Sequence, residues 1–281
     1  MAKKKDELVV KHNRLVEASY RLSLIEQQVV LFAICRCREE QRGLFADMPV
    51  TIRAVDFATQ FGLNTEDGNV YRQLKDAMDT LFSRHVIIHD TDPKTEKPRV
   101  TKSRWISQAS YIEGAGHIQF IFAPAVIPFI TKLGESGEFT SYRLEKIGRM
   151  TSTYAVRMYE ILVQYLSIGK RDIELDWLRK TLCIEGEYLR VMDFKTWVLD
   201  VAMTQINTHS DIIVSYQQRK TGRIITHFDF TIMDKAKVSA KKPKPKVKNS
   251  TKGSDPRAKP GESQDAFDHR MLEKKGQQQL I

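Results

Sequence analysis

The sequence of 281 residues has few cysteines and no long apolar run. Its three cysteines, Cys35, Cys37 and Cys183, cannot all pair, and two of them lie in one apolar helical stretch, a pattern typical of reduced thiols in the cytosol. Apolar runs such as Ile118–Ile121 are too short to cross a bilayer, and the charged start Met1–Glu7 is not an apolar signal segment. We therefore expect a cytoplasmic protein that has no disulfide framework and no membrane partner.

Motifs of common enzymes are missing as well. The sequence has no G-x-x-x-x-G-K-[ST] phosphate loop, so ATP hydrolysis would lack its usual cradle, and no His-x-His pair of the kind with which DNA-nicking proteins bind a metal ion. His85 and His89 are four positions apart, but on a predicted strand this spacing separates them by ~13 Å. We expect no catalytic residues, no metal ion and no cofactor, and hence no enzyme activity.

Positive charge is abundant but unevenly placed. The net charge is +10, and the last segment, Lys235–Ile281, holds 13 Lys and Arg against 5 Asp and Glu. The remaining body has 32 basic and 30 acidic residues. Global charge is therefore weak support for nucleic-acid binding by the folded part, and the local arrangement must decide.

Helical periodicity and turn residues predict a first series of elements. A capping box at Ser23 and Glu26 opens an apolar helix, Met48–Ile52 is a short strand, and a short helix ends at Gly62. Asn69–His85 follows as an amphipathic helix, and strands are predicted before and after a turn at Gly114–Gly116. The apolar face of the amphipathic helix consists of Val70, Leu74, Ala77, Met78 and Leu81.

The same order of elements follows a second time after residue 150. A shift of 125 positions places the apolar face of the first amphipathic helix on Leu199, Ala202, Met203 and Ile206, and Ile87–Ile88 on Ile212–Ile213. We interpret this match as an internal duplication. The prediction is an α+β protein with domains at residues 8–133 and 141–234. The tail, 235–281, is rich in Lys, Pro and Ser and is predicted to be disordered. Its role is either that of a solvated, solubilising extension or that of a basic segment that attracts DNA non-specifically.

A short helix, a tight connection, an amphipathic helix and a two-stranded hairpin form a winged helix-turn-helix, whose second helix fits the major groove of DNA. In the second half, the face of this helix opposite the predicted core mixes a cation, hydroxyls and an amide, which suits base edges: Lys195, Thr196, Trp197, Asp200 and Thr204, with Gln205 at its border. Asp200 either accepts from a cytosine amine or faces water. The hairpin turn carries Arg219, Lys220 and Arg223, which suit phosphate oxygens, and Gly222 permits the turn. An ordinary solvated helix and hairpin are the alternative.

The first half offers a weaker DNA surface. Its amphipathic helix carries a nearly neutral outer face, Arg72, Gln73, Lys75, Asp76 and Asp79, and the following turn, "DTDPKTEKPR", is mixed in charge. This half therefore binds DNA weakly or serves for protein contact. Its first helix has more apolar residues than one face needs, which indicates either a dimer interface or a core helix buried on two sides: Leu24, Val29, Leu31, Phe32 and Ile34.

Four stretches carry a family resemblance: "LSLIEQQVV", "YEILVQYL", "DFKTWVLDVAMTQIN" and "QQRKTGRIITHFDFTI". In this order they resemble the replication initiator (Rep) proteins of iteron-containing bacterial plasmids, over roughly residues 8–234. The resemblance implies two tandem winged-helix domains, of which the first contributes dimerisation and auxiliary DNA contact and the second reads repeated origin sites. It implies site reading by Lys195, Thr196, Trp197 and Asp200, a wing at Arg219, Lys220 and Arg223, and a phosphate contact by Arg157, unless that arginine faces solvent.

The resemblance further implies a functional cycle. Monomers bind the iterons of double-stranded DNA and help to open the origin, whereas homodimers in equilibrium with them bind an operator inverted repeat and repress the initiator's own gene. A host initiator ATPase and the replicative helicase are the expected partners. Two other classes stay open on the residues alone: a winged-helix transcription regulator without a replication role, and an interaction scaffold whose winged helices have lost DNA binding.

Overall fold

The computed structural model describes residues 7–40, 43, 45, 47–64, 69–92, 94–112, 114–131 and 138–241. Residues up to Ser239 belong to one compact unit, to which the following description applies. Within the described ranges, no helix combines the length and apolar character that a membrane span requires. The predicted disorder of the tail lies mostly outside the described residues. However, Lys235–Lys241 forms helix α10, so the predicted start of the tail is several residues too early.

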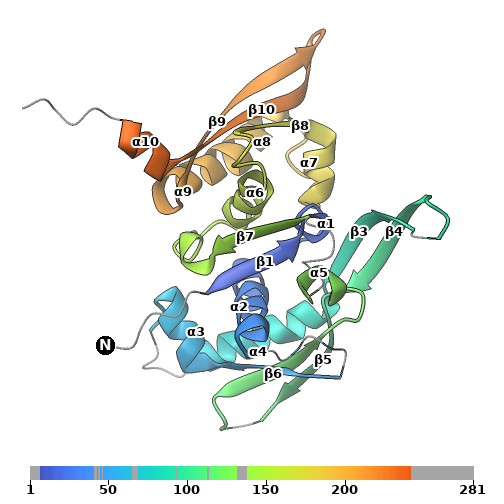
Figure 1. Ribbon diagram of the computed structural model, residues 1–281, viewed down its shortest axis with the longest axis vertical. Coiled ribbons are helices and arrows are strands. Elements are labelled where there is room, and N and C mark those ends of the chain that lie inside the picture. Colours follow the sequence, from blue (N-terminus) through green and yellow to red (C-terminus); the bar gives the residue numbers. More distant parts are fainter. Residues whose placement is uncertain are drawn as a thin grey trace, which may run out of the picture. The chain divides into compact units, whose positions relative to one another are not determined.

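The first half contains a three-stranded antiparallel sheet with helices packed against it (Figure 1). Strand order is β2-β6-β5, and a separate hairpin pairs β3 with β4. The elements are β1 (Leu8–His12), α1 (Asn13–Val16), α2 (Leu24–Glu40), β2 (Val50–Arg53), α3 (Ala54–Phe61), α4 (Asn69–Ser83), β3 (His85–Thr91), β4 (Pro98–Arg104), β5 (Ile106–Tyr111), β6 (His117–Phe122), α5 (Pro128–Thr131), β7 (Phe139–Arg143) and the 3-10 turn η1 (Leu144–Lys146).

Local sequence signals explain the helix ends. The backbone N–H of Ser23 donates to the Glu26 carboxylate at 2.5 Å, and the N–H of Glu26 donates to Ser23 Oγ at 3.3 Å, which confirms the predicted capping box. Helix α3 ends at Gly62, whose φ of 65° is the left-handed conformation that glycine adopts without strain. The predicted apolar face of α4 is also confirmed, since all five of its residues are buried.

The second half repeats this architecture. Its sheet has the order β8-β10-β9, which corresponds element by element to β2-β6-β5. The elements are α6 (Thr153–Val163), β8 (Lys170–Glu174), α7 (Leu175–Thr181), α8 (Val191–Phe194), the π-helical turn η2 (Lys195–Leu199), α9 (Asp200–His209), β9 (Ile212–Thr221) and β10 (Ile224–Asp234). The segments α8, η2 and α9 follow one another without interruption and form helix 191–209.

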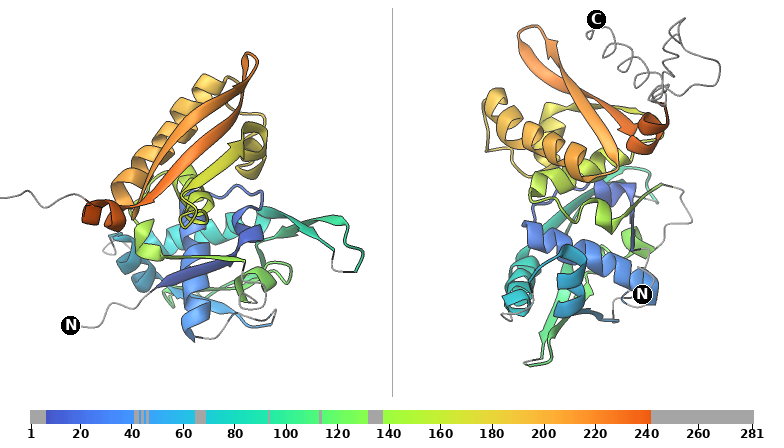
Figure 2. Two further views of the ribbon diagram at one scale, coloured as in Figure 1. Left: turned by 45° about the horizontal axis from the view of Figure 1, so that its top comes forward. Right: turned by 90° about the vertical axis from the view of Figure 1, so that its left-hand side faces the viewer.

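One part of the predicted duplication is wrong. The shift of 125 positions made Ile87 and Ile88 the counterparts of Ile212 and Ile213, in the first strand of the second hairpin. The sheet order instead makes β5 the counterpart of β9, because β3 and β4 form an additional hairpin between α4 and β5. The segment "DTDPKTEKPR" is therefore not the counterpart of the β9–β10 turn. Both the extra hairpin and β9–β10 project from the body (Figures 1 and 2).

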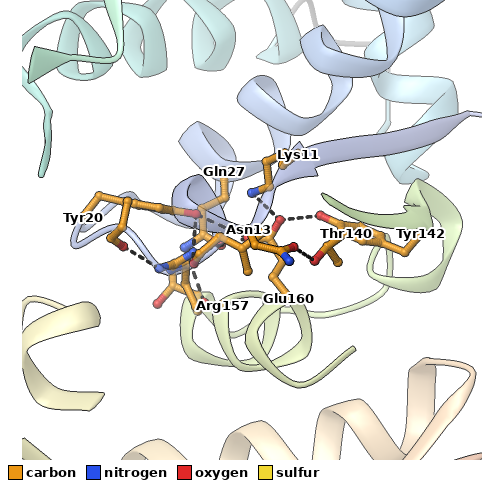
Figure 3. A network of polar contacts seen from close by, with 11 residues as sticks. Lys11, Asn13, Tyr20, Gln27, Thr140, Tyr142, Arg157 and Glu160 are labelled. Carbon is orange, nitrogen blue, oxygen red and sulfur yellow. Dashed lines mark hydrogen bonds and ion pairs between the residues drawn. The ribbon is translucent and has the colours of Figure 1, made fainter. Parts of the chain in front are cut away.

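A strand pair and a buried polar network join the two halves. Strand β1 pairs antiparallel with β7, and β7 crosses the predicted start of the second domain at residue 141. Next to this pair, the Glu160 carboxylate of α6 forms an ion pair with Lys11 and accepts hydrogen bonds from Tyr142 at 2.5 Å and Tyr20 at 3.3 Å (Figure 3). The N-terminal segment is thereby fixed to the first helix of the second half.

Helix α2 lies in the core. Val29, Leu31, Phe32 and Ile34 are all almost fully buried, and residues on every side of the helix contribute to the same apolar cluster. The apolar excess of this helix is therefore explained by burial on two sides, and these side chains are not accessible to a second copy in this structure.

Candidate nucleic-acid interface

Helix 191–209 is held in place by its buried inner face and by the side-chain amides of Gln205 and Asn207. Leu199, Ala202, Met203 and Ile206 are buried, as predicted. The side-chain amide of Gln205 accepts from the backbone N–H groups of Thr151 and Ser152 at 2.8 and 3.0 Å, just before α6 begins. The Asn207 amide makes two hydrogen bonds with the backbone of Val214 in β9, at 2.7 and 2.8 Å. Gln205, predicted at the border of the DNA-facing surface, thus serves to orient the helix.

The π-helical turn carries two further connections to strand β9. The backbone N–H of Asp200 donates to the carbonyl of Lys195, a hydrogen bond that spans five residues instead of four. Lys195 Nζ donates to Gln218 Oε1 at 3.1 Å, and Tyr216 donates its hydroxyl hydrogen to Asp200 Oδ1 at 2.6 Å. Burial and this hydrogen bond raise the pKa of Tyr216, which keeps its hydroxyl protonated. Helix and hairpin are therefore braced along their shared side.

The outer side of the helix is accessible. Thr196 and Trp197 are exposed, Trp197 to 61%, whereas Lys195 is half-buried between the helix and the ring of Tyr216. Thr204 is exposed, but its hydroxyl donates to the Asp200 carbonyl of its own helix at 2.7 Å. An open hollow of about 580 Å³ lies where the helix meets β9, and Lys195 and Asp200 are among the residues that line it. Of the predicted helix residues, Thr196 and Trp197 are thus the two whose side chains face solvent and bond no other residue that the structure describes.

The hairpin places its three basic residues near its tip. Gly222, with φ of 63°, and Arg223 form the two-residue connection, which permits a tight turn. Lys220 and Arg223 are exposed and have no ion-pair partner within the part of the chain that the structure describes. Arg219 differs, because it forms ion pairs with Asp172 of β8 and, at 3.6 Å, with Asp229 of β10. Lys220 and Arg223 are therefore the hairpin cations that remain available to phosphates.

The predicted phosphate contact of Arg157 is wrong for this structure, and so is the alternative that it faces solvent. The side chain is 3% exposed. Its guanidinium donates to the carbonyl groups of Val16 at 3.1 Å and Ala18 at 2.9 Å, bonds the Tyr20 hydroxyl and lies 3.7 Å from the centre of the Tyr20 ring (Figure 3). Arg157 is a structural residue of the junction, because its charge is used to join α6 to the N-terminal segment.

The first half has a similar brace. Tyr111 of β5 donates to Asp79 of α4 at 2.7 Å, and Lys75 Nζ lies 5.7 Å from the centre of the Tyr111 ring. In the second half Lys195 Nζ lies 6.0 Å from the Tyr216 ring. Sequence reasoning missed both tyrosines. The sequence contained one indication of them. Asp200 is an acidic side chain on a surface expected to bind DNA, so a partner for it was to be expected elsewhere in the chain.

The described residues contain no group of three or more His, Cys, Asp or Glu side chains arranged to hold a metal ion. His85 and His89 both lie on strand β3.

Comparisons with known proteins agree with this architecture. A family model described as "Initiator Replication protein, WH1" matches residues 8–163, and another described as "Initiator Rep protein, WH2" matches residues 174–232. Two Escherichia coli proteins are each 24% identical to this chain. One is an "Uncharacterized 27.6 kDa protein", matched over 81% of this chain and 94% of its own length, and the other is a "Replication initiation protein", matched over 78% and 69%.

Among solved structures, a crystal structure of the Pi initiator protein in complex with iteron DNA matches with a TM-score of 0.62 and 20% identity, and covers 82% of this chain and 98% of that chain. This match indicates the same fold of two winged-helix units.

Proposed function

The chain belongs to the initiator replication (Rep) protein family, and on this premise we propose that it is a plasmid replication initiator that binds the repeated sites, or iterons, of its origin. The Pi initiator, which shares the fold, is bound to iteron DNA in its crystal structure. The observation that carries the proposal is the braced pair of helix 191–209 and hairpin β9–β10. In this pair the helix presents Thr196 and Trp197, while the exposed cations Lys220 and Arg223 have no ion pair with any described residue.

The roles within this surface follow from general properties of protein–DNA contacts. An α-helix fits the major groove, where base edges differ in donors, acceptors and methyl groups. Cations of a hairpin bind phosphates and set the orientation of the helix without reading sequence. Lys195, Thr196 and Trp197 would therefore read the base edges of the site, whereas Lys220 and Arg223 would bind phosphates and position the helix on the DNA. Asp200 would act by bracing the helix against Tyr216.

The finer parts of the cycle are also proposals. The monomer binds iterons and helps to open the origin, and a homodimer binds an inverted repeat and represses the initiator's own gene. A host initiator ATPase and the replicative helicase bind the complex, and the chain itself acts in the cytoplasm by binding rather than by catalysis. The first winged-helix unit, at residues 8–133, supplies dimerisation and auxiliary DNA contact, and the unit at residues 141–234 reads the iteron.

A gel-shift titration tests the central proposal. The probe is a duplex that contains the direct repeats beside the gene, and the control is a scrambled duplex of the same composition and length. We expect much tighter binding to the repeats, and equal affinity for both duplexes would refute specific binding. If the protein binds its own promoter but fails to support replication of a small plasmid that carries the repeats, it is a transcription regulator instead.

A further inference from the structure

Each winged-helix unit contains a lysine and an aspartate that lie beside a strand tyrosine, and the spacing of this pair differs by one residue between the units. In α4 the braced lysine and aspartate are four positions apart, and the segment between them reads Asp76, Ala77 and Met78. In helix 191–209 they are five positions apart, and the segment reads Thr196, Trp197, Val198 and Leu199. In both segments the last two residues are buried. The lysine–aspartate interval of the second unit is therefore one residue longer and contains two exposed residues instead of one.

The π-helical turn is the structural consequence of this residue. A regular α-helix repeats every 3.6 residues, so residues five apart do not lie on one side of it. The wider turn between Lys195 and Asp200 brings both of them to the side of strand β9, where they bond Gln218 and Tyr216. Turns of this type are rare in proteins, and those that occur are often found at functional sites. Within this turn the exposed residues are the pair Thr196 and Trp197, whereas the exposed residue between Lys75 and Asp79 is the acidic Asp76.

Trp197 gives this surface an apolar group. It is 61% exposed. Tryptophan is enriched at contact surfaces, because it combines a large apolar body with a polar N–H group. Its surroundings favour DNA as the contact, because Lys195 lies in the same helix and the exposed cations Lys220 and Arg223 lie in the adjoining hairpin. In the major groove, the apolar group of a base is the 5-methyl group of thymine.

We propose that the π-helical widening of helix 191–209 makes Trp197 a reader of thymine 5-methyl groups. The inference rests on the proposed function, since it assigns part of the sequence preference of the same surface. The first unit has the four-residue spacing and exposes only the acidic Asp76 between Lys75 and Asp79, so it would contribute little to sequence reading.

Replacement of thymine by uracil tests the proposal, since it removes only the methyl group. A tight-binding duplex is first selected from random DNA with the full chain, and each thymine is then replaced singly by deoxyuridine. Wild-type protein is expected to bind about fourfold more weakly when a contacted methyl is missing, the effect of one buried methyl-sized group. Trp197→Ala is expected to bind the thymine and uracil duplexes with equal affinity. Ile168→Ala is the matched control, because Ile168 is 68% exposed and lies outside helix 191–209 and the hairpin. This variant should keep the wild-type ratio.

Two results would overturn the proposal: a wild-type protein indifferent to uracil at every thymine of the site, or a Trp197→Ala variant that retains the wild-type ratio. If no duplex is selected at all, the proposed function fails, and this outcome differs from selection without sensitivity to uracil. A variant that lacks Trp197 restores the four-residue spacing. It is expected to keep salt-dependent DNA binding and to lose the discrimination between thymine and uracil. If that deletion variant does not fold, the binding ratio of Trp197→Ala alone tests the proposal, because this substitution removes an exposed side chain and leaves the length of the helix unchanged.

Discussion

The hydroxyl group of Tyr216 donates a 2.6 Å hydrogen bond to Oδ1 of Asp200 and so joins strand β9 to helix 191–209. Tyr111 and Asp79 form the same connection in the first unit, at 2.7 Å. An aspartate on a surface that faces DNA would repel phosphates if it were free. The tyrosine hydroxyl instead holds the carboxylate at the side of the hairpin, where it joins helix 191–209 to strand β9.

Loss of this hydroxyl should therefore weaken DNA binding on every sequence. We expect Tyr216→Phe to lower the free energy of unfolding by about 1 kcal/mol, the net effect of one hydrogen bond, and to lower affinity for specific and scrambled duplexes alike, because the freed carboxylate faces the DNA. Urea unfolding and gel-shift titration measure the two effects. Tyr111→Phe is the matched control, with a similar loss of stability and a smaller loss of affinity. In a double-mutant cycle with Asp200→Asn, additive losses of affinity would contradict the brace.

The hydroxyls of the helix should differ in their effect on specificity. Thr196 is exposed and its hydroxyl bonds no described residue, whereas the Thr204 hydroxyl donates to the Asp200 carbonyl. We expect Lys195→Ala and Thr196→Ala to cost about 1–3 kcal/mol of binding free energy and to relax the preference at single base pairs. Thr204→Ala should cost much less. Titration of each variant against a set of single-base-pair substitutions of the site measures this, and equal effects at the two threonines would contradict the assignment.

Salt dependence separates the three hairpin cations. Lys220→Ala or Arg223→Ala should reduce the slope of log affinity against log salt by ~0.9 for each phosphate that the variant no longer neutralises. Arg219→Ala should change the slope less, because Asp172 and Asp229 already neutralise its charge. Lys220→Arg keeps the charge and should keep the slope. Titrations at several salt concentrations provide the measurement, and an unchanged slope for both Lys220→Ala and Arg223→Ala would place the hairpin outside the interface.

The parts of this fold that depend on local sequence were predictable. The capping box at Ser23, the glycine end of α3 and the buried face of helix 191–209 each follow from residues within a few positions of one another. The order of the elements then indicated two winged-helix units. The sequence also predicted Lys195 and the hairpin cations as DNA contacts, from an amphipathic helix followed by a basic hairpin, and their role stays a prediction.

The parts that depend on distant segments were not predictable. Strands β1 and β7 are five residues each and pair although most of the first unit lies between them in the sequence, so neither has a local signal beyond mixed composition. The burial of Arg157 depends on the carbonyls of Val16 and Ala18, which no periodicity reveals. The role of Asp200 likewise depends on Tyr216 in another element. For both Arg157 and Asp200, a charged side chain that the sequence placed at the surface has a partner in an element distant in the sequence.

The junction between the two units should respond to acid. Burial alone would raise the pKa of Glu160, but Lys11, Arg157 and the hydrogen bonds from Lys11 and Tyr142 outweigh it and leave the pKa below its ordinary value. The folded state therefore resists protonation more than the unfolded chain does. The stabilisation is complete above the unfolded carboxyl pKa of about 4.3 and is lost as the pH falls through the lower folded value.

Substitution of Glu160 tests this junction. Glu160→Gln should destabilise the protein by about 3–5 kcal/mol at neutral pH, because Lys11 and Arg157 stay buried without their carboxylate. The double variant Lys11→Met, Glu160→Gln should lose less than the sum of the two single variants, since one of the orphaned charges is removed. Urea unfolding at pH 7 and at stepwise lower pH gives the measurement. The difference between wild type and Glu160→Gln should shrink below about pH 4.3, where Glu160 of the unfolded chain takes up a proton that the folded carboxylate still resists. A difference that stays constant over this range would mean that folding leaves the pKa of Glu160 unchanged, and a difference that grows as the pH falls would mean that Glu160 is neutral in the folded protein.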